Sequence, residues 1–271
     1  MPASSADHAV RRSGLSQPIR ARSGDSRTMP FGEYSMTGTY QFAEKTVRID
    51  SIYEGIHAYC RDYAVPGPSG GEDIAVTISQ ADLDHERSRA GGSWSDGYLE
   101  LLAVYRRIAE KMPAYDTVLM HGSAVAVDGC AYLFIAPSGT GKSTHARLWR
   151  EAFGERAVMV NDDKPLVKIT SSAATVFGTP WNGKHRLGSN ISAPLKAVCI
   201  LERAQTNRIR KIDPYEAYPV LLQQTYRPAD PLMLKKTLSL IDRLSETAGL
   251  YRLGCNMERE AALVSYDGMR D

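Results

Sequence analysis

The sequence predicts an α/β protein with a large core domain and a smaller α/β lobe ahead of it. Three observations lead to this fold class. A glycine-rich loop lies between a strand pattern and a helix pattern, strand and helix patterns alternate on both sides of it, and the chain is long enough for a large core. Of its 271 residues, 43% are hydrophobic and 24% are charged, which is ordinary for a globular protein.

Composition also indicates which classes of binding partner and which cellular compartment to expect. The 33 basic and 31 acidic residues leave a net charge of +2, which argues against a nucleic-acid partner. No apolar run approaches the ~20 residues of a membrane span, so we expect no membrane contact. The cysteines are far apart, without a C-x-x-C pair or a secretory signal, which predicts reduced thiols in a cytoplasmic protein; they are Cys60, Cys130, Cys199 and Cys255.

The chain divides into three predicted segments. Residues 1–35 are rich in Ser, Arg, Pro and Gly, which is typical of a disordered tail. Residues 36–115 predict the small lobe, with a strand over 40–51, helical spacing over 52–59, a strand over 73–79 and a helix over 95–112. Residues 116–271 predict the core domain, which ends in helices.

The core domain begins with a predicted hairpin. Two apolar runs, 119–127 and 130–136, flank Asp128 and Gly129, a pair that favours a tight turn between strands. After the glycine-rich loop, the pattern predicts a helix over 142–153, strands over 156–161 and 196–203, helices over 215–225 and 231–248, a short strand over 250–255 and a last helix.

The glycine-rich stretch APSGTGKST, residues 136–144, is called the glycine loop below. A strand, a glycine turn and a helix present backbone N–H groups and the positive end of the helix dipole to an anion. Lys142 would contact the β and γ phosphates of ATP, or of GTP, and Ser143 would bind Mg²⁺. Ala136 replaces the first glycine of the P-loop pattern and should fit if its φ is negative. The predicted nucleotide-binding residues are Ser138, Gly139, Thr140, Gly141, Lys142, Ser143 and Thr144.

An acidic pair, Asp162 and Asp163, ends the first predicted strand after that helix. Because ligands gather at the carboxyl ends of strands in parallel or mixed sheets, we expect the pair to face the glycine loop. One carboxylate would hold Mg²⁺ with Ser143, for which we name Asp162, and the other would accept the proton of an attacking hydroxyl. A solvated acidic turn is the alternative interpretation.

Three stretches follow one another at short intervals, and they are HGSAVAVDG, APSGTGKST and VNDD. Together they resemble the HPr kinase/phosphorylase family. The resemblance covers about residues 119–205 and implies a P-loop kinase core related to phosphoenolpyruvate carboxykinase. It places the family's histidine on His121 and its acidic pair on Asp162 and Asp163, with Asp163 favoured as the base. The catalytic set that we predict is therefore Asp163, Asp162, His121 and Lys142.

The sequence departs from that family after the acidic pair. The glycine-rich signature of the bifunctional enzymes is replaced by GTPWNGKHRLGSN, residues 178–190, and the amino-terminal lobe is small. The resemblance therefore does not extend to dephosphorylation or to HPr as the substrate. The compact format, with PWNGKH and LLQQTYRP, is more similar to HPr kinase-related proteins encoded beside ribosomal peptide clusters, including lasso-peptide precursor kinases that phosphorylate a C-terminal serine.

Four basic residues are further candidates for contacts with substrate: Lys184, His185, Arg203 and Arg227. Lys184 and His185 follow Trp181 in a loop, where they would bind a γ-phosphate or a substrate carboxylate; the alternative is a surface loop anchored by the tryptophan. Arg203 and Arg227 are candidates for neutralising the transferred phosphoryl group, and solvated surface charges are the alternative. His145 is interpreted as structural.

These features predict an ATP- and Mg²⁺-dependent kinase that phosphorylates a serine hydroxyl of a peptide or small protein. One alternative is a kinase for a small hydroxylated molecule, which would enclose its substrate rather than bind it in an open groove. The other is a nucleotide-gated binding module without chemistry. The sequence leaves the acceptor, the choice of ATP or GTP, and assembly into a homo-oligomer open.

Overall fold

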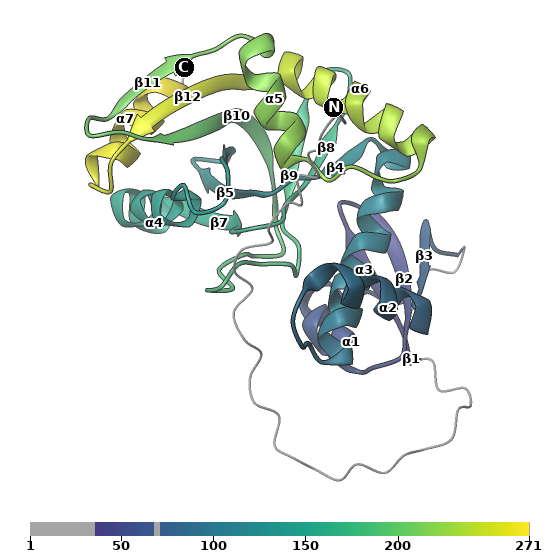
Figure 1. The fold of residues 1–271 in the computed structure, drawn as a ribbon. Helices are drawn as coiled ribbons and strands as arrows, with labels where there is room; N and C mark the ends of the chain where they lie inside the picture. Colours follow the sequence, from purple (N-terminus) through teal and green to yellow (C-terminus); the bar gives the residue numbers. More distant parts are fainter. Residues whose placement is uncertain (1–35, 68–70, 271) are drawn as a thin grey trace, which may run out of the picture.

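The computed structural model describes residues 36–67 and 71–270, so the predicted tail over 1–35 lies outside the described residues. The described residues form two sheets, one of three strands in the small lobe and one of nine strands in the larger domain. Figure 1 shows the small lobe, drawn in purple and blue, below one end of the larger domain. The protein is thus a mixed α/β structure.

The small lobe packs helices against its sheet. Strand β1 (Met36–Phe42) is antiparallel to β2 (Lys45–Ser51), and β2 is parallel to β3 (Ile74–Thr77). The helices are α1 (Gly55–Tyr59), α2 (Gln80–Ala90) and α3 (Asp96–Lys111), with a 3-10 turn over Arg61–Tyr63. Helix α3 and strand β3 agree with the sequence prediction, whereas α2 was not predicted.

The prediction of one strand over residues 40–51 is wrong. The chain turns at Ala43 and Glu44, whose φ angles are 48° and 65°. Neither residue type favours the left-handed region, so the sequence carried no turn signal there. Ala43 is 4% exposed, which indicates that packing in the lobe stabilises the turn.

The larger sheet is mixed and curled. Its strands are β4 (Thr117–Leu119), β5 (Gly122–Val127), β6 (Cys130–Ile135), β7 (Ala157–Asn161), β8 (Leu166–Ile169), β9 (Ala174–Phe177), β10 (Ser192–Arg203), β11 (Arg208–Lys211) and β12 (Gly249–Cys255). The order is β4-β8-β9-β10-β6-β5-β7, and β12 pairs with β10 and β11. The long strand β10 pairs with β9 near its start and with β12 farther along, so the sheet branches at β10.

The predicted hairpin is confirmed. Strands β5 and β6 are antiparallel, and Asp128 and Gly129 turn between them with φ angles of 52° and 83°. The apolar run over 119–127 is not one strand, however, because β4 pairs with β8 while β5 pairs with β6 and β7. Periodicity could not reveal this break, since the strands on both sides of it are buried throughout and show no alternation. Strands β8, β9 and β11 were not predicted.

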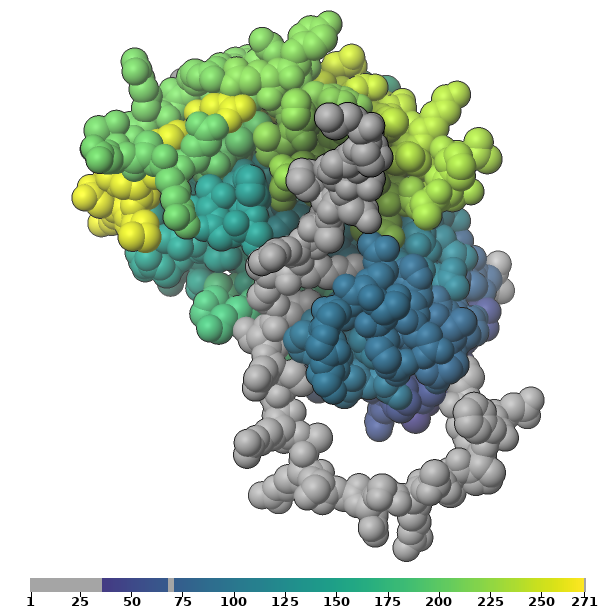
Figure 2. All heavy atoms as spheres, in the orientation of Figure 1, coloured from purple at the N-terminus to yellow at the C-terminus, as the bar shows by residue number. Residues whose placement is uncertain are grey.

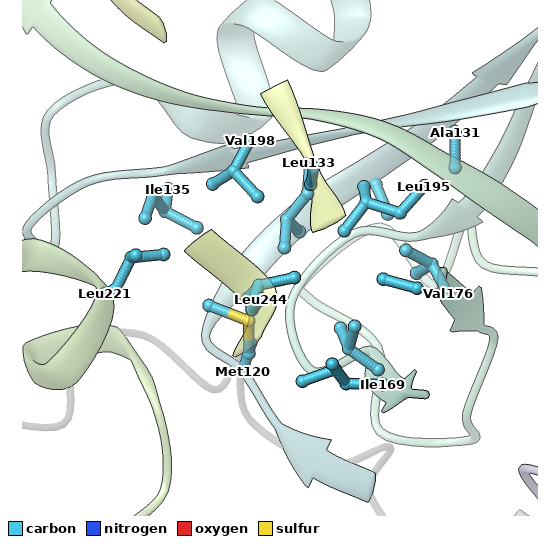
Figure 3. Packing of buried hydrophobic residues seen from close by; sticks show 14 of the residues in the cluster. Met120, Ala131, Leu133, Ile135, Ile169, Val176, Leu195, Val198, Leu221 and Leu244 are labelled. Atoms are coloured by element: carbon cyan, nitrogen blue, oxygen red, sulfur yellow. The ribbon is translucent and has the colours of Figure 1, made fainter. Parts of the chain in front are cut away.

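Helices cover both faces of the larger sheet. Alternate residues of β5 and β6 face α4 (Lys142–Phe153) and α7 (Glu260–Met269), and the others face α5 (Pro214–Gln224) and α6 (Pro231–Thr247). Figure 3 shows the cluster that faces α5 and α6, in which Leu221 of α5 and Leu244 of α6 lie near Ile135 and Leu133 of β6. Among the described residues, no helix has the length and apolarity that a bilayer crossing needs.

Trp181 joins the small lobe to the larger domain. Its side chain is 7% exposed, and its ring centroid lies 5.5 Å from that of Phe42 and 5.6 Å from that of Tyr105. Figure 2 shows the small lobe as a distinct body that touches the larger domain. Trp181 therefore anchors its loop between the two parts of the molecule.

Candidate functional site

The glycine loop joins the end of β6 to the start of α4 and has an open backbone. Gly139 and Gly141 have φ angles of 77° and 128°, which side-chain-bearing residues rarely adopt. A Cβ at either position would meet no described atom within 4 Å, so the loop faces open space. Ala136 does not have a positive φ, which is the condition under which we expected an alanine to fit the first position.

The first turn of α4 offers backbone N–H groups to an anion. Gly141 is the N-cap residue, and within the described chain no side chain accepts from the N–H groups of that turn, nor does the turn hold an acidic residue. Each free N–H and the helix dipole favour negative charge at this point. The start of α4 therefore leaves backbone N–H groups available to an anion, and the nucleotide-binding role of the glycine loop stays a prediction.

Lys142 folds back over the glycine loop. Its Nζ donates a hydrogen bond of 2.9 Å to the carbonyl oxygen of Ala136, and the residue is 8% exposed. Burial lowers the pKa of Lys142 to about 8, and the positive charge of Lys164 lowers it further, while Asp163 acts in the opposite direction. Lys142, Lys164 and Asp163 are thus close enough to interact electrostatically.

A second turn, residues 161–164 (NDDK), is called the acidic turn below. Asn161 organises it, since its Oδ1 accepts from the N–H groups of Asp163 and Lys164 at 2.9 and 2.6 Å. The Nδ2 of Asn161 donates to the carbonyl and the hydroxyl of Thr179, and that hydroxyl donates to the carbonyl of Lys164. These two residues were missed, although an asparagine before such a turn is a known signal for side-chain capping of turns.

The glycine loop and the acidic turn lie at the same edge of the sheet. Strands β6 and β7 are both antiparallel to β5, so their carboxyl ends point the same way. The N–H of Gly122 donates to the carbonyl of Asp163 at 3.0 Å, and the hydroxyl of Ser123 donates to the carbonyl of Asp162 at 3.2 Å. The start of β5 therefore holds the acidic turn in place.

The two aspartates have different surroundings. Asp162 is 6% exposed, and its Oδ1 accepts from the N–H of Gly183 at 2.6 Å; burial raises its pKa. Burial also raises the pKa of Asp163, but the hydrogen bond from His121 and the charge of Lys164 outweigh it, and the net shift is downward. Asp163 is consequently ionised at neutral pH. The carboxylate of Asp162, by contrast, holds the loop that contains Gly183 through a hydrogen bond.

His121 lies directly beside Asp163. Its Nε2 is 3.3 Å from Asp163 Oδ1, and the Nζ of Lys164 is also 3.3 Å from that oxygen. Burial lowers the pKa of His121, and the charges of Lys164 and Lys142 add to this effect, while Asp163 partly offsets it. His121 is therefore neutral at pH 7 and has one nitrogen next to an ionised carboxylate.

The loop that carries Lys184 and His185 lies next to the acidic turn, but both side chains are exposed. Asp162 holds the loop through Gly183, and Arg186, with a φ of 49°, stacks over the ring of Tyr59 in the small lobe at 5.3 Å. Within the described parts of the chain, neither the Lys184 nor the His185 side chain forms a hydrogen bond or an ion pair. Their substrate roles remain predictions.

The two arginine candidates contact backbone carbonyls. The guanidinium of Arg203 donates to the carbonyl oxygens of Gly139 and Thr140, so it supports the glycine loop from the β10 side. Arg227 donates to the carbonyl of Leu222 at 2.9 Å. Its chain segment is near the site, because the N–H of His121 donates to the carbonyl of Gln224 at 2.7 Å. His145 is buried against Ser265 and Trp149, in agreement with a structural role.

A metal ion would find a sparse set of protein ligands here. Within the described parts of the chain there is no group of three or more His, Cys, Asp or Glu residues that could hold one. Ser143 is exposed and makes no hydrogen bond given for the described residues, and Asp162 keeps acceptor capacity because a carboxylate offers about four lone-pair sites. This set suits Mg²⁺, which binds through one or two protein groups together with phosphate oxygens and water.

Comparisons with known proteins give a family match over part of the chain and a remote structural similarity. A family described as SynChlorMet cassette protein ScmC matches residues 93–227, a stretch that includes the glycine loop and the acidic turn. Among solved structures, the HPr(Ser) kinase/phosphatase from Coxiella burnetii is similar at 14% identity and a TM-score of 0.24, over 47% of this chain and 97% of that chain. A search of curated proteins finds no match.

Proposed function

We propose that this protein is an ATP- and Mg²⁺-dependent phosphotransferase that moves the γ-phosphoryl group to a serine hydroxyl of a peptide or small protein. One observation carries the proposal: the ionised carboxylate of Asp163, paired with neutral His121, lies at the same sheet edge as the open glycine loop, and its charge acts on Lys142. An anion site beside a positioned base is the arrangement that phosphoryl transfer to a hydroxyl requires.

The residues present fit a nucleoside triphosphate. The loop N–H groups and Lys142 would bind the β and γ phosphates, since the loop faces open space and no acid lies in the first turn of α4. Ser143 and Asp162 would hold Mg²⁺. When bound, the metal ion neutralises charge on the phosphates and lowers the barrier to transfer.

The protein's own residues position and deprotonate the acceptor. Asp163 accepts the proton of the serine hydroxyl, the serine oxygen forms a bond to the γ-phosphorus, and the bond to the β-phosphate oxygen breaks to release ADP. His121 orients Asp163 through the contact at 3.3 Å. Lys142 carries a positive charge below pH of about 8 and stabilises the charge that develops on the transferred group.

The acceptor class is argued from the surroundings of the acidic turn. The loop with Lys184 and His185 is exposed beside Asp162, and it would contact an acceptor that extends past the site. This open arrangement favours a peptide or small protein over an enclosed metabolite. A C-terminal serine of a ribosomal peptide precursor, as in the lasso-peptide kinases, is the narrower form of the proposal, with the terminal carboxylate near those cations.

The test is direct phosphorylation. The protein is incubated with labelled ATP, Mg²⁺ and the peptides encoded beside its gene, and the phosphate is located by mass spectrometry. A phosphoserine that forms with the native protein and not with the Asp163→Asn variant supports the proposal. If the label is transferred to a small hydroxylated compound and to no peptide, the protein would instead be a kinase for a metabolite. ATP binding with no transfer to any acceptor, unchanged in Asp163→Asn, would leave a binding module.

A further inference from the structure

A cavity of about 500 Å³ adjoins the glycine loop on the side away from the acidic turn. Its walls are the first half of the glycine loop, the last residues of β10, Arg252 of β12 and Val220 of α5. Figure 1 shows α5 beside β10 and β12. Because the cavity and the loop share Ser138, Gly139 and Thr140, a molecule bound to the loop can extend into the cavity.

The strand order gives the bound molecule a direction. Along this edge the strands run β12-β10-β6-β5-β7, with the cavity at β10 and β12, the glycine loop after β6 and the acidic turn after β7. Neighbouring strands are ~4.8 Å apart, so β10 and β7 are separated by roughly 14 Å. A triphosphate that extends from Asp163 across the glycine loop would therefore have its other end at the cavity.

The cavity combines an apolar floor with a charged rim. Ile200 and Val220 belong to or pack against the same apolar cluster beneath α5, and both line the cavity. At the rim, Arg252 donates to Glu202 and to Glu216, which fixes its guanidinium. Arg203 donates to the loop carbonyls of Gly139 and Thr140 and so joins the cavity wall to the phosphate site. An apolar surface with a few fixed polar groups is typical of a small-molecule pocket.

We propose that this cavity binds the nucleoside of ATP, with the base against Ile200 and Val220 and the ribose hydroxyls donating to Glu202. The proposal rests on the proposed function, because it assumes that a nucleoside triphosphate binds the glycine loop. Glu202 is suited to this contact, since its side chain is 53% exposed and a carboxylate accepts from ribose hydroxyls. The occupant is thus a nucleotide rather than an inorganic polyphosphate, and the cavity supplies the selectivity.

The experiment measures equilibrium binding by calorimetry, without any acceptor, for ATP and for inorganic tripolyphosphate. The full chain is compared with Val220→Trp, which fills the cavity, and with Gln223→Trp, a control on the exposed face of the same helix. We expect Val220→Trp to weaken ATP binding at least about tenfold, because the base loses its apolar contact, and to leave tripolyphosphate binding unchanged. The control should bind both ligands as the native chain does.

A second variant tests the ribose contact. The native protein should bind ATP more tightly than 2′,3′-dideoxy-ATP, and Glu202→Gln should reduce that preference.

Equal binding of ATP by Val220→Trp and the native chain overturns the proposal, as does an equal loss of ATP and tripolyphosphate binding in that variant. If the native protein binds neither ligand, the proposed function itself fails. Native binding of tripolyphosphate as tightly as ATP instead leaves the phosphate site intact and removes only the nucleoside assignment.

Discussion

The glycine loop and the acidic turn meet at one edge of the sheet, yet they are built in opposite ways. The glycine loop exposes its backbone, with two glycines at positive φ and a helix start that no described side chain caps. In the acidic turn, by contrast, Asn161 accepts from two N–H groups, and the carbonyls of Asp162 and Asp163 accept from the start of β5.

This difference corresponds to two separate tasks in the proposed function, which are the binding of a nucleotide and the positioning of a base. Unpaired N–H groups at a helix start are completed by an anion, so in the proposed function the glycine loop is a binding surface whose hydrogen bonds form with the ligand. A base must already be in place when the acceptor arrives, and the hydrogen bonds of the acidic turn hold Asp163 in a fixed position before any ligand binds. Changes in the loop should therefore act on nucleotide binding, and changes in the turn on transfer.

The largest expected effect is that of Lys142→Ala. Removing the ammonium group takes away the positive charge closest to the phosphates, and we expect phosphoryl transfer to fall by about 10²–10³-fold or more, as when a transition-state donor is removed elsewhere. The far-ultraviolet circular dichroism and the unfolding midpoint should stay near those of the native protein. Transfer at the native rate in a folded variant would reject the role given to Lys142.

The acidic turn provides a sharper comparison between neighbours. Asp163→Asn should reduce transfer by about 10²-fold at every Mg²⁺ concentration, because the proton acceptor is lost while the contacts to nucleotide remain. Asp162→Asn should raise the Mg²⁺ concentration needed for half-maximal rate, and excess Mg²⁺ should restore part of the activity. A magnesium titration of both variants checks this, and identical titration curves would contradict the separate roles.

Much of the larger domain could be predicted from local patterns. The hairpin at Asp128 and Gly129, the glycine loop and helix α4 follow from residue types with strong conformational preferences. The small-lobe hairpin could not be predicted, because Ala43 and Glu44 take left-handed conformations that only tertiary packing supports. The split between β4 and β5 was equally hidden, since residues that are buried on both faces show no period.

The residues of the candidate site could be predicted only in part from the sequence. Lys142 and Asp163 could be named because their spacing to the glycine turn and to a strand end is short. The opposite environments of Asp162 and Asp163 depend on Gly183 and His121, which come from distant parts of the chain and approach only in the folded state. Arg203 illustrates the same limit, because nothing in its sequence context indicates that it donates to the glycine loop.

A smaller effect is expected from Gly141→Ala. At a φ of 128° a Cβ is strained even though the space around it is open, so the substitution should cost about 1–3 kcal/mol in the loop's bound geometry and weaken ATP binding about tenfold or more. Gly55→Ala is the matched control, since Gly55 also has open space but no positive φ. Calorimetric titration with ATP compares the two, and equal affinities would show that the loop does not need glycine there.

The smallest expected effect is the pH dependence of nucleotide binding. Burial lowers the pKa of Lys142 to about 8, so its ammonium is present below that pH and is lost as the pH rises through it. The terminal phosphate does not titrate in this range, since its second pKa is about 6. ATP affinity should therefore decline by a few fold between pH 7 and pH 9, and this decline should disappear in Lys142→Ala, whose affinity is low throughout. Lys111→Ala, at an exposed lysine far along α3, should keep the native profile. A flat profile in the native protein would mean that Lys142 keeps its proton and that the glycine loop is more open to water than its buried ammonium indicates.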